Sequence, residues 1–359
     1  MENPVELSVV IPAYQAEKTI GRAINSVRAL EGIALEIIVV DDGSKDATPN
    51  IVAAISAADA RVRLIAQSNA GRSAARNVGI HAAHGKWVMF IDSDDYLYPN
   101  VSEPLKASIG NADTALYIFA AHQNNGFDAY GRPWEGEYCN PLAITSSASE
   151  LFDYMLGMPR FDEPFGSGAY QLDSVWARLY LREKLTGINI KSELGEWGPF
   201  PVSVRLSEDR LLNIAYLSTC DGERVKFRPE TIYCWDTGYS QTCEVVRADE
   251  PADMLRYWNY CQDLCEAGSI TGLQARYLLT TELISKFARA VRADNLPQKV
   301  FASKWKELLA EDAIRALKVS MVAGNAVLRK WTIGAVLIKA RNIPAAFSVC
   351  SLLYRAIHR

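Results

Sequence analysis

The sequence contains few of the residues that build metal cages or disulfide frameworks. It has only 4 histidines in 359 residues, and its 7 cysteines are scattered with no CxxC pair. A zinc site built from histidine and cysteine is therefore not expected. The first residues, MENPVELSVVIPAY, also lack the basic start and the apolar stretch of a secretory signal. We therefore expect reduced thiols and a cytoplasmic protein.

Long apolar runs are missing as well. A membrane-spanning helix needs roughly 18 or more predominantly apolar residues in a row. The best candidates here, residues 331–338 and 343–354, are separated by Lys339, Arg341 and Asn342. The sequence therefore predicts a chain that does not cross a membrane.

Two common nucleotide-binding signatures are also absent. IPAYQAEKTIG stands where a nicotinamide-binding protein would carry GxGxxG after its first strand, and neither GxxxxGKS nor GxxxxGKT occurs. The net charge of −4 at pH 7 argues against a general nucleic-acid binder, which normally has a basic face. These absences argue against nicotinamide-dependent dehydrogenases, P-loop enzymes and nucleic-acid partners.

The first hundred residues do contain a regular alternation of short apolar runs and helical patterns. Such runs, separated by amphipathic helices, are typical of a parallel sheet with helices on both faces. The expected strands are residues 7–14, 35–44, 61–67 and 86–95, with helices over 17–30, 46–58 and 73–84. After these, we expect loops over 120–170, interrupted by a helix near 148–157. Residues 174–185 should form a helix, or a strand that leads into a helix. We also expect a helix over 207–220, an extended segment over 225–237, and mostly helix from 249 onward. The predicted fold is α/β, a mostly parallel sheet followed by a C-terminal helical region.

Polar residues follow each of the four expected strands, at 12–14, 41–44, 69 and 92–95. Ligands of such sheets bind beyond the carboxyl ends of the strands, so these groups should converge on one rim. Asp92 and Asp94 can present oxygens to Mg²⁺ or Mn²⁺ there, although a solvated acidic turn gives the same local pattern. Asp41 and Asp42 can accept hydrogen bonds from a nucleotide base or ribose, or form a turn into the next helix.

Several segments, taken in order and spacing, resemble the family 2 inverting glycosyltransferases of GT-A fold, especially bacterial enzymes that build capsule, exopolysaccharide or lipopolysaccharide. They are IPAYQAEKTI, VVDDGSKDAT, QSNAGRSAARNVGI, GKWVMFIDSDDYLYP and SEDRLLN. The resemblance is close over residues 5–105 and weaker over 170–240, and we recognise nothing beyond 245. It implies a Rossmann-like GT-A domain that binds a nucleotide-diphosphate sugar, most simply a UDP-sugar.

The resemblance also implies roles for individual residues. The donor would be bound by Pro12, Ala13, Tyr14, Asp42, Asn69, Arg76, Asp92 and Ser93, with Asp42 on the uracil ring. Asp94 matches the residue that binds the metal cofactor, Mn²⁺ or Mg²⁺. Asp209 matches the catalytic base, although Ser207, Glu208 and Asp209 would also suit a plain helix N-terminus. Trp176, Arg178 and Glu208 would line the acceptor side, although a core aromatic beside a surface cation would explain Trp176 and Arg178 equally well.

The sequence departs from the family pattern over residues 232–242. Related enzymes often have a basic residue there, close to the diphosphate, whereas this chain has Trp235 and Asp236. Either Arg178, Tyr239 or Ser240 replaces that cation, or the phosphate contact is lost.

The charge is unevenly distributed along the chain. Residues 318–359 contain 7 basic residues and no Asp or Glu among helically spaced apolar positions. This pattern fits a helix on an anionic membrane surface, or a subdomain that packs on the body or on another copy. We expect a catalytic domain over 1–245, with a nucleotide-sugar half over 1–105 and an acceptor half over 106–245, and a helical region over 246–359.

The expected function is metal-dependent, inverting sugar transfer from a nucleotide-diphosphate donor to a saccharide or lipid-linked saccharide. Two alternatives remain open. A catalytically weak homologue that only binds nucleotide sugar is compatible with the unusual 232–242 segment. A sugar nucleotidyltransferase would also be an α/β protein with metal-binding carboxylates, but IPAYQAEKT lacks the glycine-rich, arginine-containing loop that such enzymes usually have.

Overall fold

The computed structural model describes residues 4–111, 113–124, 144–156, 172–188, 190, 198–205, 207–236, 238, 250–276, 278–279 and 282–283. The chain forms two compact units, one from Met1–Phe152 and Glu163–Ser240, the other from Asp153–Asp162 and Gln241–Arg359. The basic segment 318–359 and the candidate phosphate-binding residues Tyr239 and Ser240 lie outside the described residues. All site residues discussed below belong to the first unit.

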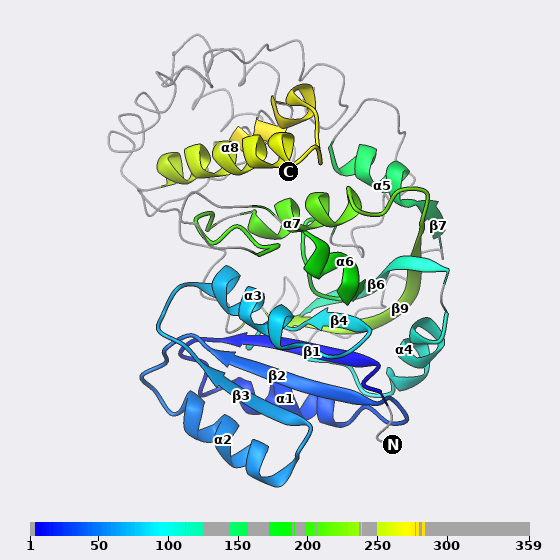
Figure 1. Ribbon diagram of the computed structural model, residues 1–359. Helices are drawn as coiled ribbons and strands as arrows, with labels where there is room; N and C mark the ends of the chain where they lie inside the picture. The colour runs from blue at the N-terminus through cyan, green and yellow to red at the C-terminus, as the bar shows by residue number, and fades with distance from the viewer. Residues whose placement is uncertain are drawn as a thin grey trace, which may run out of the picture. The chain divides into compact units, whose positions relative to one another are not determined.

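The first unit begins with four parallel strands, as the alternating pattern predicts. They are β1 (Leu7–Ala13), β2 (Leu35–Asp41), β3 (Val62–Ala66) and β4 (Trp87–Phe90), in the spatial order β3-β2-β1-β4. The connecting helices are α1 (Ile20–Arg28), α2 (Thr48–Ala58) and α3 (Arg72–Ala82). Figure 1 shows α1 and α2 on one face of this sheet and α3 on the other. Every residue of β1 and β2 is buried, which explains their continuous apolar sequences.

Helix α3 packs unusually close to β1. A Cβ atom added at Gly79 would lie 2.2 Å from Cγ1 of Val10, so only glycine fits between the helix and the strand. Arg76, one turn earlier on α3, is thereby held against the sheet with no solvent exposure. The glycine in the QSNAGRSAARNVGI motif thus helps to place the arginine of the same motif.

The rest of the first unit extends this sheet with mixed pairing. Its elements are β5 (Tyr96–Leu97), α4 (Ser102–Ile109), β6 (Thr114–Asn124), β7 (Ile144–Ser147), the first five residues of α5 (Ala148–Met155), β8 (Arg178–Leu181), α6 (Arg182–Gly187), α7 (Glu208–Leu217) and β9 (Arg224–Asp236). The order continues β4-β8-β6-β9-β5, and β7 pairs with β9. Strands β6 and β9 are parallel, whereas β8 runs antiparallel to both β4 and β6.

The expected fold class is confirmed, with one local correction. The loop expected over 120–170 is wrong at its edges, because β6 continues to Asn124 and β7 spans Ile144–Ser147. Both segments are strands because they pair with β9, a partner far away in sequence. The ambiguous segment 174–185 is a strand followed by a helix. In the second unit, α8 (Glu250–Glu266) confirms a helix after residue 249. None of the helices within the described ranges is long and apolar enough to cross a membrane.

Candidate active site

The polar ends of the first four strands do meet at one edge of the sheet. At this rim the backbone N–H of Asp42 donates to the carbonyl of Ala13 at 2.8 Å, which joins the end of β2 to the end of β1. Pro12 and Ala13 are buried, whereas Tyr14 is 53% exposed just beyond β1. A large exposed aromatic at a strand end can contact a planar ligand.

Asp42 shapes the loop after β3. Its Oδ1 accepts hydrogen bonds from Gln67 Nε2 at 2.7 Å and from the backbone N–H of Ala70 at 2.8 Å, and its Oδ2 accepts one from the N–H of Gly71 at 2.9 Å. Asn69 lies within this loop and is exposed. Since Oδ2 accepts only this bond within the described residues, it retains a lone pair for a ligand.

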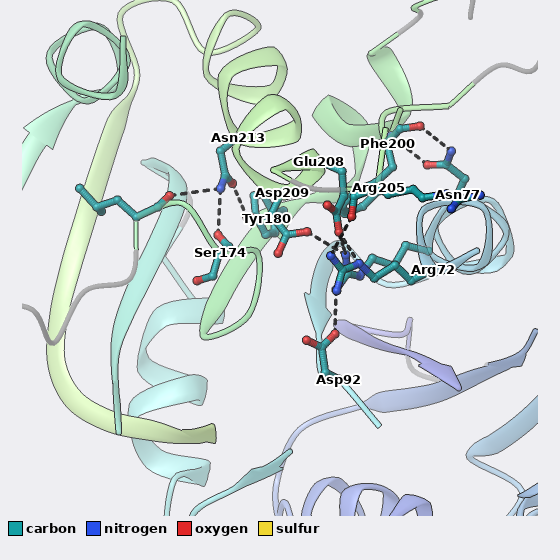
Figure 2. Close-up of polar contacts among 12 residues, drawn as sticks. Arg72, Asn77, Asp92, Ser174, Tyr180, Phe200, Arg205, Glu208, Asp209 and Asn213 are labelled. Atoms are coloured by element: carbon teal, nitrogen blue, oxygen red, sulfur yellow. Dashed lines mark hydrogen bonds and ion pairs between the residues drawn. The ribbon is translucent and has the colours of Figure 1, made fainter. Parts of the chain in front are cut away.

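Arg76 is the centre of the site. Its guanidinium is fully buried and donates through Nη2 to Asp92 Oδ1 at 2.7 Å and through Nη1 to Asp209 Oδ1 at 2.8 Å. Asp92 and Asp209, both labelled in Figure 2, therefore accept hydrogen bonds from different nitrogens of the same guanidinium. Arg76 therefore joins the end of β4 to the start of α7, which follows 133 residues later in the chain.

Two acids begin α7 and have different environments. Glu208 is 1% exposed, forms an ion pair with Nε of Arg72, and lies 3.6 Å from Nη1 of Arg76. The side chain of Asp209 is 19% exposed, so it is the acid that reaches the rim. Ser207, just before them, has a φ of +64°, and it makes no side-chain capping bond. A simple serine N-cap therefore does not explain this segment.

The electrostatics favour a proton-accepting role for Asp209. Burial raises its pKa above the ordinary carboxyl value, and the negative charges of Glu208 and Asp92 act in the same direction. The adjacent Arg76 opposes them. A carboxylate whose pKa lies above the usual range is a stronger base than a solvated one, which suits general-base chemistry.

The acidic turn after β4, formed by residues 92–95, is held in place by hydrogen bonds to β9. The backbone N–H of Asp92 donates to Tyr233 Oη at 3.2 Å, and Tyr233 Oη donates to Asp95 Oδ2 at 2.5 Å. The N–H of Asp236 donates to Asp95 Oδ1 at 2.8 Å. Burial and the charges of Asp92 and Asp94 raise the pKa of Asp95. Asp95 therefore faces the protein and fixes the turn, while Asp92, Ser93 and Asp94 are only half-buried.

Asp94 is the residue best suited to a cation. Burial, with Asp92 and Asp236 nearby, raises its pKa to about 6, because its negative charge is poorly compensated. Within the part of the chain that the structure describes, no three His, Cys, Asp or Glu side chains converge on one point, so the protein offers no closed cage. Mg²⁺ and Mn²⁺ suit such a site, since they accept one or two carboxylates and complete their coordination with water and phosphate oxygens.

The atypical segment near the end of β9 does have a cation beside it. Asp236 Oδ2 forms an ion pair with Nη1 of Arg22, on α1, at 2.7 Å. Of the candidates from the sequence, Arg178 is buried and donates to the carbonyl of Leu172, whereas Tyr239 and Ser240 lie outside the described residues. Arg22 was missed because nothing in its local sequence distinguishes it from an ordinary exposed helix residue.

Of the acceptor-side candidates, Trp176 belongs to an aromatic group and Arg178 is a buried cation. The Trp176 ring stacks on Tyr233 with centroids 4.8 Å apart and an angle of 6°, and Trp235 lies 6.2 Å away, tilted by 34°. Arg178 is fully buried and donates from Nη2 to the carbonyl of Leu172 at 2.7 Å. Trp235 is half-buried, so this aromatic group reaches the surface at the end of β9.

Three further residues position the site and were not singled out from the sequence. Arg72 and Asn77 lie in the same motif as Arg76, and Asn213 closes the SEDRLLN motif. Asn213 accepts from Tyr180 Oη at 2.6 Å and donates to the carbonyl of Ser174 at 2.8 Å, which ties α7 to the segment before β8 (Figure 2). The signal in the sequence that could have found them is their position in these two motifs.

Asn77 holds the segment before α7 against α3. Its Nδ2 donates to the carbonyl of Phe200 and its Oδ1 accepts from the N–H of Phe200, each at 3.0 Å, as Figure 2 shows. The Phe200 ring lies 5.2 Å from the guanidinium carbon of Arg76. This pair of bonds therefore fixes an aromatic wall of the Arg76 pocket.

Asn77→Ala is expected to lower the free energy of unfolding by about 2–3 kcal/mol, because both backbone groups of buried Phe200 lose their partner. Urea denaturation measures this loss. Asn25→Ala is the control: Asn25 is exposed on α1, and its loss should cost less than about 0.5 kcal/mol. Equal losses for the two variants would contradict a structural role for the Asn77 contact.

Known proteins resemble this chain in sequence and in fold. A stretch of 111 residues is 49% identical to the succinoglycan biosynthesis protein ExoO of Rhizobium meliloti (strain 1021), covering 31% of this chain and 30% of that protein. A stretch of 191 residues is 31% identical to the uncharacterized glycosyltransferase YibD of Escherichia coli (strain K12), covering 53% of each. The chain thus spans about a third to a half of the length of these curated relatives.

Among solved structures, S. aureus TarS 1–349 in complex with UDP-GlcNAc matches 98% of this chain and 92% of its own, with a TM-score of 0.66 and 17% identity. At that identity the likeness concerns the fold alone. Together with the sheet described above, it defines a GT-A fold. Residues 8–156 match the family model "Glycosyl transferase family 2".

Proposed function

We propose that this chain is a metal-dependent, inverting glycosyltransferase that uses a nucleotide-diphosphate sugar, with a UDP-sugar as the first candidate. One observation carries the proposal: the buried Arg76 guanidinium joins Asp92 of the acidic turn to Asp209 at the start of α7. A carboxylate suited to a cation, Asp94, and a carboxylate suited to proton transfer, Asp209, thereby share one rim.

On the donor side, Pro12, Ala13 and Tyr14 would border the base, with Asp42 and Asn69 on its polar edge. Asp92, Ser93 and Arg76 would lie towards the ribose and the diphosphate. Mn²⁺ or Mg²⁺, held by Asp94, would supply positive charge that offsets the charge on the departing diphosphate. The excess of carboxylates around the 92–95 turn suits a cation there, since burial and the negative charges of Asp92 and Asp236 raise the pKa of Asp94.

On the acceptor side, Asp209 would take the proton of the attacking hydroxyl. Its position at the rim and its raised pKa both support this role. A single displacement from the side opposite the leaving group would invert the anomeric centre. Glu208 would act behind Asp209, by holding Arg72 and Arg76, as well as lining the acceptor side.

The acceptor would be a saccharide or a lipid-linked saccharide bound near Trp176 and Arg178. The likeness to ExoO, a succinoglycan biosynthesis protein, supports a product in bacterial surface polysaccharide. We assign catalysis to residues 1–245, with the donor half over 1–105 and the acceptor half over 106–245. We further propose a cytoplasmic enzyme whose region 246–359 contacts the membrane peripherally through its basic segment 318–359.

Metal-dependent nucleotide binding tests the donor site directly. UDP is expected to raise the melting temperature of the purified chain when Mn²⁺ or Mg²⁺ is present, and to have little effect in EDTA, because an ion held by Asp94 would supply the positive charge that attracts the diphosphate. Asp94→Ala should abolish the metal-dependent part of this shift. Asp113→Ala, which removes an exposed carboxylate paired with Arg224 and Lys226, should preserve it.

Other outcomes favour the alternatives. A metal-independent UDP shift that Asp94→Ala leaves unchanged would contradict the metal site. Binding of a UDP-sugar without release of UDP in the presence of any acceptor would favour a binding homologue. Formation of a sugar nucleotide from UTP and a sugar phosphate would favour a nucleotidyltransferase.

A further inference from the structure

Arg22 contacts two segments of the rim that are far apart in the chain. From α1, its Nη2 donates to the backbone carbonyl of Asp94 at 2.7 Å, and its Nη1 pairs with Asp236 Oδ2 at 2.7 Å. Its guanidinium carbon also lies 4.6 Å from the centroid of the Tyr96 ring. One side chain therefore connects α1, the acidic turn and the end of β9.

The partner of Arg22 is itself firmly held. Asp236 is 6% exposed, its Oδ1 accepts from the N–H of Gly238 at 3.1 Å, and its own N–H donates to Asp95 Oδ1. Asp95 is in turn bonded to Tyr233. The contacts thus form a closed circuit, which runs from Arg22 through Asp236 and Asp95 and returns through the turn to the carbonyl of Asp94.

The turn needs such an anchor for a physical reason. Asp92, Asp94 and Asp95 lie within four residues of one another, so their negative charges repel. Without a restraint, the half-buried Asp94 would lower the free energy of the protein by turning towards solvent. A guanidinium donates along two directions from a planar group, so it can hold a carbonyl and a carboxylate at once, which an ammonium does less well.

We propose that Arg22 is a positioning residue for the divalent cation: it fixes the turn that carries Asp94, and Asp236 orients Arg22. This inference rests on the proposed function. It also gives the unusual acidic residue at 236 a role, since that carboxylate aims a cation that comes from α1.

The sign of the effect on cation affinity separates positioning from simple electrostatics. Arg22 and Mn²⁺ are both positively charged and repel each other. If this repulsion were the only effect, removing the charge of Arg22 should tighten Mn²⁺ binding. If Arg22 positions Asp94, its removal should weaken Mn²⁺ binding instead. Loss of a residue that orients a metal ligand typically weakens affinity by about 10–100-fold.

The experiment measures Mn²⁺ affinity by calorimetry or by the EPR signal of free Mn²⁺, with UDP at saturation. Arg22→Gln should weaken Mn²⁺ binding about tenfold or more, and Arg22→Lys, which keeps the charge, should also weaken it, by a smaller factor. Arg28→Gln is the matched control. Arg28 lies on the same helix and pairs with Asp59 at 2.8 Å, with a side-chain exposure of 32% against 38% for Arg22. It should leave Mn²⁺ affinity unchanged.

UDP affinity without metal completes the test. It should be nearly equal in the wild type and in Arg22→Gln, and a loss as large as that for Mn²⁺ would mean that Arg22 binds the diphosphate directly, which overturns the positioning role. Unchanged or tighter Mn²⁺ binding in Arg22→Gln would overturn it too. If the wild type itself binds no Mn²⁺ with UDP, the proposed function fails instead.

Discussion

Asp209→Asn is expected to lower turnover by about 10²–10⁴-fold, because an amide cannot accept the proton of the acceptor hydroxyl. Asparagine has the same shape, and its Oδ1 can still accept the hydrogen bond from Arg76 Nη1 that Asp209 accepts at 2.8 Å. Affinity for UDP with Mn²⁺ should therefore change by less than about threefold, since donor contacts are made elsewhere on the rim. Steady-state kinetics and calorimetry measure the two effects.

The matched control is Asp221→Asn, which removes an exposed carboxylate beyond the C-terminal end of α7. It should leave both turnover and UDP affinity unchanged. The pH dependence provides a second readout. The base must be ionised, so kcat/KM should fall as the pH drops through the pKa of Asp209. Burial raises that pKa, so this acidic limb should lie above the ordinary carboxyl value of about 4. Equal turnover for wild type and Asp209→Asn would contradict the assignment.

Arg76→Met is expected to have the largest effect on stability, a loss of about 3–5 kcal/mol in the free energy of unfolding. Methionine fills a similar volume but leaves Asp92, Glu208 and Asp209 without their shared cation. Uncompensated buried charge is costly because the interior cannot solvate it. Urea or thermal denaturation measures the loss, and a variant that does not fold at all is the extreme form of the same result.

Arg28→Met supplies the comparison for Arg76→Met. Its ion pair with Asp59 is partly exposed, with 32% of the arginine side chain accessible, so its loss should cost no more than about 1 kcal/mol. A cost for Arg76→Met as small as that of Arg28→Met would show that the buried carboxylates do not depend on this guanidinium. Arg76 would then not be the residue that holds the site together.

Much of this arrangement is readable from the sequence because its signals are local. The apolar runs and helical spacings of the first hundred residues predict β1 to β4 and α1 to α3. The position of polar residues directly after each strand predicts the rim. Both depend on short-range periodicity and on the rule that parallel strands end at the same edge.

The contacts that hold the site together are not local, and the sequence does not reveal them. Arg76 meets Asp209 across 133 residues, and Arg22 meets Asp94 across 72 residues. Asn77 and Phe200 pair across 123 residues. No periodicity indicates which arginine will face which acid. The same limit explains why β6 and β7, which depend on pairing with β9, were expected as loop at 120–124 and 144–147.

Asp236 illustrates how structure changes the interpretation of a sequence departure. From the sequence, an acid in place of a basic residue suggested a lost or displaced phosphate contact. In the structure the acid pairs with Arg22 and its backbone bonds to Asp95. The charge at this edge of the rim is therefore balanced by a residue that precedes it in the chain by more than two hundred positions.

The most direct test of the proposed activity is release of UDP from a panel of UDP-sugars by the purified chain, with Mn²⁺ or with EDTA. At least one donor should give UDP release that requires the metal and that falls by about 100-fold or more in Asp209→Asn. Absence of UDP release from every donor, or release at the same rate with EDTA and in Asp209→Asn, would contradict the proposal that this rim is the active site of a glycosyltransferase.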